Sequence, residues 1–223
     1  LAACADAGVE RVAIAVRGTQ RSRWADPTGL VAAARELSEK SFGPATAKYR
    51  ELGTASNLLT FNRLNVLPTR NFQRGSFAEA EAIAPEQLQI ARQRTRASCA
   101  ACTIGCEHLY ALGDKSPGKV RLEYESLFAL GSLCGVSDSE AVLACTQRCD
   151  QLGLDTISAG GTIAFAMECV ERGYLDAPQL RFGDGKAVLE MLDAIGAGTG
   201  LGPLLAFGSR ALAERLGGDA IAF

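Results

Sequence analysis

Three cysteines form the densest group of chemically capable side chains in this sequence. Cys99, Cys102 and Cys106 follow a C-x2-C-x3-C spacing. Thiolates this close along the chain can converge on one soft metal centre, whereas two of them can hardly form a disulfide in so tight a loop. Iron–sulfur clusters usually take four cysteines, and structural zinc takes four Cys or His side chains. The run therefore predicts a metal site whose fourth ligand comes from elsewhere.

Two other interpretations of these cysteines remain open from the residues alone. His108 lies two residues after Cys106 and could complete a Cys3His zinc site, although the spacing is cramped. The three cysteines could also be small buried apolar residues that bind no metal. The corresponding functions are a helical interaction module stapled by zinc and a metal-free helical remnant.

Carboxylates flank a predicted turn between two helices. Asp150 and Asp155 bracket Gly153 and Leu154, and the glycine would permit a sharp change of direction. Such a turn presents acceptors and free amides to a ligand rich in N–H and C=O groups, such as a reduced pterin or a purine. The same pattern also describes an ordinary glycine C-cap followed by an aspartate that begins the next helix.

Two more carboxylates, Glu123 and Glu125, bracket Tyr124. In an extended segment their side chains would share one face, so at least one could be a solvated surface charge. A carboxylate in a desolvated pocket has a raised pKa and can carry protons. The segment 65–72 contains a proline and two asparagines and is predicted to be an irregular loop rich in hydrogen-bonding side chains.

Composition excludes several classes of partner. The 223 residues, 48% of them apolar, suffice for a globular core. The 23 basic and 25 acidic residues give no electrostatic case for binding nucleic acid or an anionic membrane surface. The longest uncharged stretch falls short of the roughly 20 apolar residues of a membrane span. Eight cysteines, bunched in a chain of this size, favour a reducing, cytoplasmic compartment.

Helix start and stop signals cover most of the sequence. A β-rich run over 11–16 predicts one strand, and 119–124 alternates like a short extended segment. Seven helices are expected, over 27–40, 44–59, from 85 to the cysteine loop, from the capping box at 137–140 to Gly153, and over 158–172, 186–195 and 203–216. The predicted fold class is mainly α and multihelical, with a small strand-bearing N-terminal remnant.

Several patches in the same order resemble the aldehyde ferredoxin oxidoreductase family, tungsten- or molybdenum-bispterin enzymes that oxidise aldehydes to carboxylates. Such a series of independent patches is far more specific than any one of them. They are Gly53–Ala55, Leu67–Phe72, the cysteine run, Glu123–Leu127, Asp150–Ser158 and Thr162–Glu168.

The resemblance implies a role for each patch. Cys99, Cys102 and Cys106 resemble three ligands of a [4Fe–4S] cluster, and Glu125 resembles the active-site glutamate near the metal, which we expect to carry a proton. The first of the family's two pterin-binding turns would comprise Asp150, Gly153, Leu154 and Asp155. Arg70 and Asn71 are expected to be polar contacts to cofactor or substrate. In the family, the cluster relays electrons one at a time to ferredoxin or a similar carrier.

The resemblance also implies that parts are missing. The family's fourth cluster cysteine and active-site histidine lie downstream, and its β-rich base domain lies upstream. We therefore expect a central fragment, inactive by itself, in which residues 1–84 form the end of the base domain with connecting helices and 85–223 form the helical domain. Cys134, Cys145, Cys149 and Cys169 have no ligand counterpart, and Cys145 and Cys149 are expected to pack in the core.

The partners implied are an aldehyde substrate and an electron carrier, with a homodimer left open and neither nucleic acid nor membrane expected. A family member with another substrate, such as the bispterin subunit of an aromatic acyl-CoA reductase, is the alternative within the same fold. Tungsten and molybdenum are not distinguished by the sequence.

Overall fold

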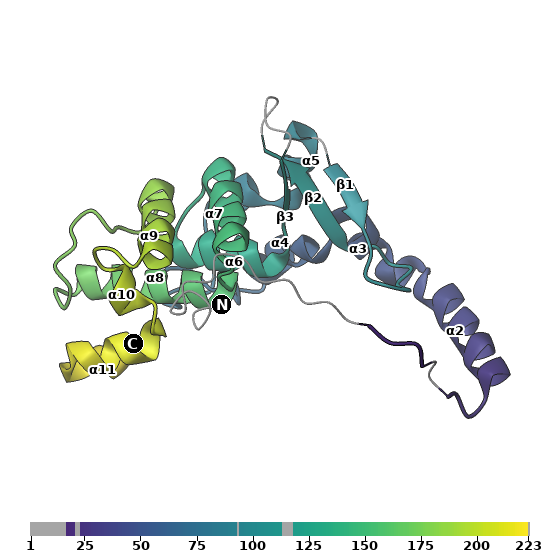
Figure 1. The fold of residues 1–223 in the computed structure, drawn as a ribbon. Coiled ribbons are helices and arrows are strands. Elements are labelled where there is room, and N and C mark those ends of the chain that lie inside the picture. Colours follow the sequence, from purple (N-terminus) through teal and green to yellow (C-terminus); the bar gives the residue numbers. More distant parts are fainter. Residues whose placement is uncertain (1–16, 21–22, 93, 113–117, 223) are drawn as a thin grey trace. The chain divides into compact units, whose positions relative to one another are not determined.

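The computed structural model describes residues 17–20, 23–92, 94–112 and 118–222 (Figure 1). The chain divides into two compact units, Leu1–Ser41 and Phe42–Phe223. The strand predicted over 11–16 lies outside the described residues. The domain boundary predicted after residue 84 stays a prediction about the complete protein.

The first unit contributes one described helix, α2 (Pro27–Ser41), close to the predicted 27–40. Asp26 caps it by accepting a hydrogen bond from Gly29 N at 2.8 Å, with proline at the first helical position. Pairs such as Arg35 and Glu39 stabilise its exposed face weakly. None of its residues is buried within the described chain.

The second unit is mainly helical with one small sheet, which confirms the predicted class. Short 3-10 turns separate several of its helices. Its α-helices are α3 (Ala47–Leu52), α4 (Asn57–Arg63), α5 (Pro85–Ala91), α6 (Tyr124–Leu130), α7 (Ser139–Leu152), α8 (Thr156–Glu171), α9 (Gly185–Ala197), α10 (Gly202–Leu205) and α11 (Gly208–Leu216).

The sheet has three antiparallel strands, β1 (Arg94–Ala97), β2 (Glu107–Ala111) and β3 (Lys119–Arg121), in that spatial order (Figure 1). The extended segment predicted over 119–124 is confirmed as β3 in its first part. The helix predicted from 85 to the cysteine loop is wrong beyond Ala91, because the following residues pair with β2 instead, Arg94 opposite Tyr110. Pairing with the next strand along the chain overrides the helical preference of arginine.

Glycines break two helices that the sequence predicts as continuous. Gly53 adopts φ +70° and separates α3 from α4 within the predicted 44–59 helix. Within the predicted 203–216 helix, α10 ends at Leu205 and α11 begins at Gly208, whose φ is +87°. Glycine adopts such angles without steric cost, so the chain can change direction at both glycines. The structure also contains α6, which begins at Tyr124, the last residue of the segment predicted to be extended.

Helix α8 lies at the centre of the core. Its residues Ile163, Ala164 and Met167 are fully buried, and it packs against α6 and α11, while α7 packs against α9. A Cβ atom at Gly160 would lie 2.4 Å from the carbonyl oxygen of Ala129 on α6. The absence of a side chain at Gly160 therefore permits the close approach of α6 and α8.

Among the described residues, no single helix has the length and apolar composition needed to cross a membrane. The two segments Tyr124–Cys134 and Ser139–Leu152, bent by 119°, pass that test only as a pair and on length and composition alone.

Candidate functional site

The three clustered cysteines lie in the loop of a β-hairpin, residues 98–106, which joins β1 to β2 and is called the cysteine hairpin below. Cys102 N donates to Cys99 O at 3.0 Å, and Ala101 and Gly105 adopt φ +59° and +62°. Those left-handed residues turn the chain back within a few positions. All three thiols are free, with Cys99 exposed and the other two half-buried.

The thiols in the cysteine hairpin influence one another electrostatically. Burial raises the pKa of the Cys106 thiol, and the charges of Cys102, Cys99 and Glu123 raise it further. Within the described residues, no group of three or more His, Cys, Asp or Glu side chains is arranged to hold a metal ion. A four-iron cluster, however, is a larger body than one ion, and three soft thiol donors on one loop fit its chemistry.

His108 is engaged elsewhere, which removes the fourth ligand of the zinc alternative. Its side chain is fully buried on β2, with Nε2 3.2 Å from Arg50 O and Nδ1 3.3 Å from Arg94 Nη1. Burial and the charge of Arg94 lower its pKa, so the imidazole is neutral, and it fits a carbonyl at Nε2–H and a guanidinium donor at Nδ1. Both ring nitrogens are therefore used within the fold.

Gly53 and Thr54 connect the cysteine hairpin to the first turn of α6. A Cβ atom on Gly53 would lie 2.8 Å from Cys106 O, so the chain passes the hairpin with no room for a side chain. The next residue, Thr54, accepts a hydrogen bond at Oγ1 from Tyr124 N at 3.0 Å. That amide is one of the unpaired donors at a helix start. Two adjacent residues thus hold the cysteine loop beside the helix that carries Glu125.

Glu125 lies in the first turn of α6 and is half-buried. Its Oε2 atom is buried, and no hydrogen-bond partner for it is found in the described part of the chain. Burial raises the pKa of Glu123, and the charge of Glu125 raises it further. Burial and Glu125 also raise the pKa of Tyr124 to about 12. A buried, unpaired carboxylate oxygen is costly, so Oε2 can accept a contact from a group outside the described residues.

The turn between α7 and α8 has the geometry that local capping requires. Gly153 ends α7 at φ +68°, and Leu154 N donates to Cys149 O at 2.9 Å. Asp155 begins α8, where Oδ1 accepts from Ser158 N at 2.7 Å. That hydrogen bond lowers the pKa of Asp155. Asp150 is exposed. Capping accounts for the turn by itself, and its contact with a pterin stays a prediction.

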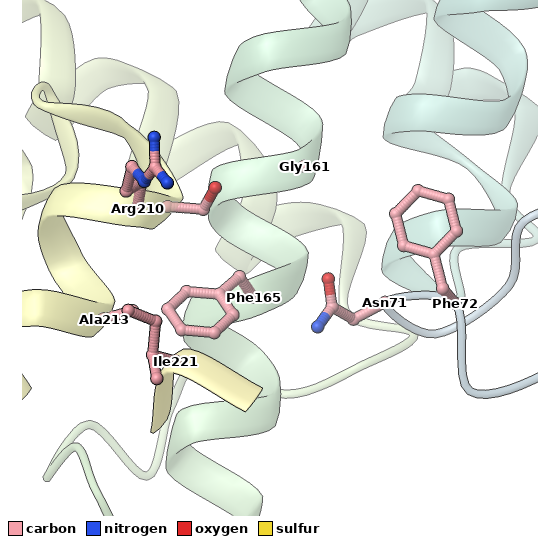
Figure 2. A pocket seen from close by; sticks show the side chains of 8 residues that line it. Asn71, Phe72, Gly161, Phe165, Arg210, Ala213 and Ile221 are labelled. Carbon is pink, nitrogen blue, oxygen red and sulfur yellow. The ribbon is translucent and has the colours of Figure 1, made fainter. Parts of the chain in front are cut away.

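Arg70 and Asn71 turn their polar groups towards α8. Arg70 Nη2 lies 2.6 Å from Glu171 Oε1, and Asn71 Nδ2 donates to Glu168 Oε2 at 2.7 Å. Asn71 and Phe72 also line a cavity of about 380 Å³ between α8 and α11 (Figure 2). A second cavity, about 440 Å³, shares part of this lining and adds Phe128 of α6 and Ile157 of α8. The residues common to both are Phe72, Gly161, Ser209 and Arg210.

Residues 30–223 match the family model described as aldehyde ferredoxin oxidoreductase, domains 2 and 3. The chain belongs to the aldehyde ferredoxin oxidoreductase family. It is 36% identical over 216 residues to the tungsten-containing aldehyde ferredoxin oxidoreductase of Thermococcus kodakarensis, and 35% identical over 217 residues to that of Pyrococcus furiosus. Each match covers 92% of this chain and 35% of the relative. The chain thus spans about a third of the length of these relatives.

A solved structure shares the fold. The active-site complex BamBC of benzoyl coenzyme A reductase, in complex with 1,5-dienoyl-CoA, contains a chain similar to this one with a TM-score of 0.60 and 22% identity. The similarity covers 77% of this chain and 26% of that one. At this identity the likeness shows the fold alone.

The structure connects some of the predicted site residues to one another. The cysteine hairpin and Glu125 are joined through Gly53 and Thr54. Helix α6 also packs on α8, which begins at the predicted pterin turn. Thr54 and Glu168 support these residues in the fold and were not predicted from the sequence. The only sequence signal for them is that both lie inside the patches that resemble the family.

Proposed function

We propose that the complete protein containing this chain is a cytoplasmic aldehyde oxidoreductase with a tungsten bispterin centre and a [4Fe–4S] cluster. It would convert an aldehyde and water to a carboxylic acid, releasing two protons and two electrons, and would pass the electrons to ferredoxin or a similar carrier. One observation carries the proposal: the cysteine hairpin is tied through Gly53 and Thr54 to a helix start whose Glu125 holds a buried, unpaired oxygen.

The chain's own residues would divide the remaining work. When bound, the bispterin metal supplies oxygen transfer and two-electron chemistry, and the cluster supplies one-electron relay. Cys99, Cys102 and Cys106 would hold the cluster from one loop. Glu125 would take up a proton at Oε2, an atom that has no competing hydrogen bond in the described fold. Asp155, fixed by Ser158 N, would keep the pterin turn in one conformation.

The decisive test uses the longest natural form of the protein, purified without oxygen. We expect bound tungsten and iron together with aldehyde-dependent reduction of a viologen dye. A fully loaded protein that ignores aldehydes but acts on an aromatic acyl-CoA would establish the alternative function instead. The 223-residue chain alone is expected to be inactive, because the resemblance places further cofactor ligands outside it.

Glu125→Gln tests the proton carrier in the complete enzyme. The amide has nearly the same shape but cannot take up a proton, so we expect kcat to fall by roughly 100- to 10,000-fold. Metal and iron contents should stay unchanged, which separates lost chemistry from lost cofactor. The control is Glu190→Gln, which removes an exposed carboxylate paired with Lys186 on α9. If Glu125→Gln leaves turnover and its pH profile intact, Glu125 is not the proton carrier.

A further inference from the structure

Three successive residues without a glycine among them adopt left-handed backbone angles. Arg70, Asn71 and Phe72 have φ values of +48°, +48° and +63°. Such angles are uncommon for any residue with a side chain, and a bulky residue such as Phe72 adopts them only when its surroundings impose them. The segment is called the Arg70–Phe72 turn below. Other parts of the fold must therefore hold it.

Backbone hydrogen bonds supply the first support. Arg70 N donates to Ser132 O and Asn71 N donates to Leu133 O, both at 3.0 Å. Ser132 Oγ donates in return to Pro68 O at 2.7 Å. These bonds fix the turn against the segment that follows α6. They satisfy the amides but do not select the left-handed angles, because the same amides could reach acceptors in other conformations.

A buried carboxylate supplies the second support. Glu168 of α8 is 2% exposed, and its Oε2 accepts from Asn71 Nδ2 at 2.7 Å. Its Oε1 accepts from Arg172 Nε, also at 2.7 Å. Burial alone would raise the pKa of Glu168, but hydrogen bonds from Asn71, Arg172 and Gln73 lower it below the ordinary value. The carboxylate is therefore ionised at neutral pH, and Asn71 is one of the few groups that compensate its burial.

A second contact between the turn and α8 offers a natural control. The Arg70 guanidinium pairs with Glu171 one helical turn from Glu168 and stacks at 4.4 Å on the ring of Phe182. The side chains of Arg70 and Glu171 are 31% and 43% exposed. Solvent weakens such a pair. The exposed Arg70–Glu171 ion pair should therefore constrain the turn much less than the buried hydrogen bond between Asn71 and Glu168, although both join the turn to the same helix.

The turn forms part of a cavity wall. In Figure 2 the side-chain amide of Asn71 points towards Phe165, and the ring of the next residue, Phe72, projects in a different direction. Both residues line the cavity of about 380 Å³, and Phe72 lines the neighbouring one as well. Gly161 of α8 leaves open space there, because a Cβ atom on it would meet nothing within 4 Å. The position of Phe72 thus contributes to the shape of both cavities.

We propose that Glu168 is a positioning residue that holds the Arg70–Phe72 turn through Asn71 and so shapes the ligand-facing wall beside α8. The consequence for aldehyde binding rests on the proposed function. The structural role does not, because it follows from contacts within this chain. Helix α8 would then begin at the predicted pterin turn and carry, in its last turn, the residue that fixes the cavity wall.

Hydrogen exchange on the complete protein tests the structural role. In Glu168→Gln we expect the Arg70 and Asn71 amides to exchange at least about tenfold faster, while amides of α7 and α9 keep their rates. Glu171→Gln should change the same amides by less than about threefold. Unchanged exchange in the turn of Glu168→Gln would overturn the proposal, and so would an equal increase throughout the unit.

Asn71→Gly provides a second variant in case Glu168→Gln folds poorly. Glycine adopts positive φ freely and lacks the amide that Glu168 accepts from. If Glu168 acts through Asn71, adding Glu168→Gln to Asn71→Gly should bring no further increase in exchange at Arg70. Additive effects of the two substitutions would contradict that route.

Aldehyde kinetics test the functional consequence. A misplaced wall should raise KM for aldehydes at least about fivefold while kcat changes by less than about twofold in Glu168→Gln, with Glu190→Gln as the unchanged control. An unchanged KM alongside faster exchange would refute the role in shaping the wall. A wild-type protein with no aldehyde activity would refute the proposed function, and the exchange data would still decide the role of Glu168.

Discussion

Two pairs of cysteines share one spacing and have opposite environments. Cys102 and Cys106 are four residues apart in the cysteine hairpin, and Cys145 and Cys149 are four apart on α7. The first pair is half-buried in an irregular loop with free thiols, whereas the second is 1% and 0% exposed inside the core. The predicted core packing of Cys145 and Cys149 is confirmed. Spacing alone therefore does not make a ligand set, and access together with backbone conformation decides the role.

The core environment also changes the chemistry of the thiol. Burial raises the pKa of both Cys145 and Cys149 to about 12. Burial likewise raises the pKa of Cys134, whose Sγ donates to Ala129 O. The thiolate is the form that binds metals and reacts. These core cysteines therefore remain neutral thiols at physiological pH, which suits packing and disfavours coordination.

The largest difference between the two groups should appear in metal content. In the complete protein, Cys102→Ser should abolish cluster iron and lower viologen reduction by at least roughly 100-fold, because serine is a poor ligand for iron–sulfur clusters. The matched control is Cys145→Ala, which should keep full iron. Iron analysis and the absorption near 400 nm are the measurements. A Cys102→Ser protein with a full complement of iron would place the cluster elsewhere.

Thiol labelling should separate the groups without any cofactor. In metal-free protein at mildly alkaline pH, the cysteines of the hairpin should react at least about 100-fold faster than Cys134, Cys145 and Cys149, since the core thiols require local opening of the fold. Peptide mapping by mass spectrometry assigns each site. Equal labelling rates would show that the hairpin thiols are as protected as the core.

The pH dependence of stability should differ as well, by a smaller amount. A thiol whose folded pKa is about 12 and whose unfolded pKa is near 9 binds more protons when folded, so the free energy of unfolding falls as pH rises from about 9 to about 12. Each such thiol contributes a slope of about 1.4 kcal/mol per pH unit. Urea unfolding of Cys149→Ala should show a shallower slope than wild type.

Local signals explain which parts of the fold were predictable. Helices α7, α8 and α9 lie close to their predicted ranges because an aspartate begins each and local turns end them, although Asp138 rather than Ser137 supplies the cap of α7. Strand β1 was mistaken for helix because its pairing with β2, across the cysteine hairpin, decides its conformation. The residues of β1 by themselves do not reveal that pairing.

The candidate site follows from the sequence only in part. Spacing and resemblance indicate the cysteine run and Glu125, whose roles stay predictions, but they do not indicate the position of Glu125 in the first turn of a helix. The Arg70–Phe72 turn has no glycine to announce its left-handed angles, and its partner Glu168 lies 97 residues from Asn71. Such long-range support becomes visible only when the chain is folded.

Gly53 has room for a hydrogen atom and none for a methyl group against Cys106. Because the next residue binds the start of α6, the cysteine loop and Glu125 would be expected to move as one rigid body. In the proposed aldehyde oxidation, a rigid body of this kind would keep the cluster-binding loop and the proton-accepting carboxylate at a constant separation during thermal motion.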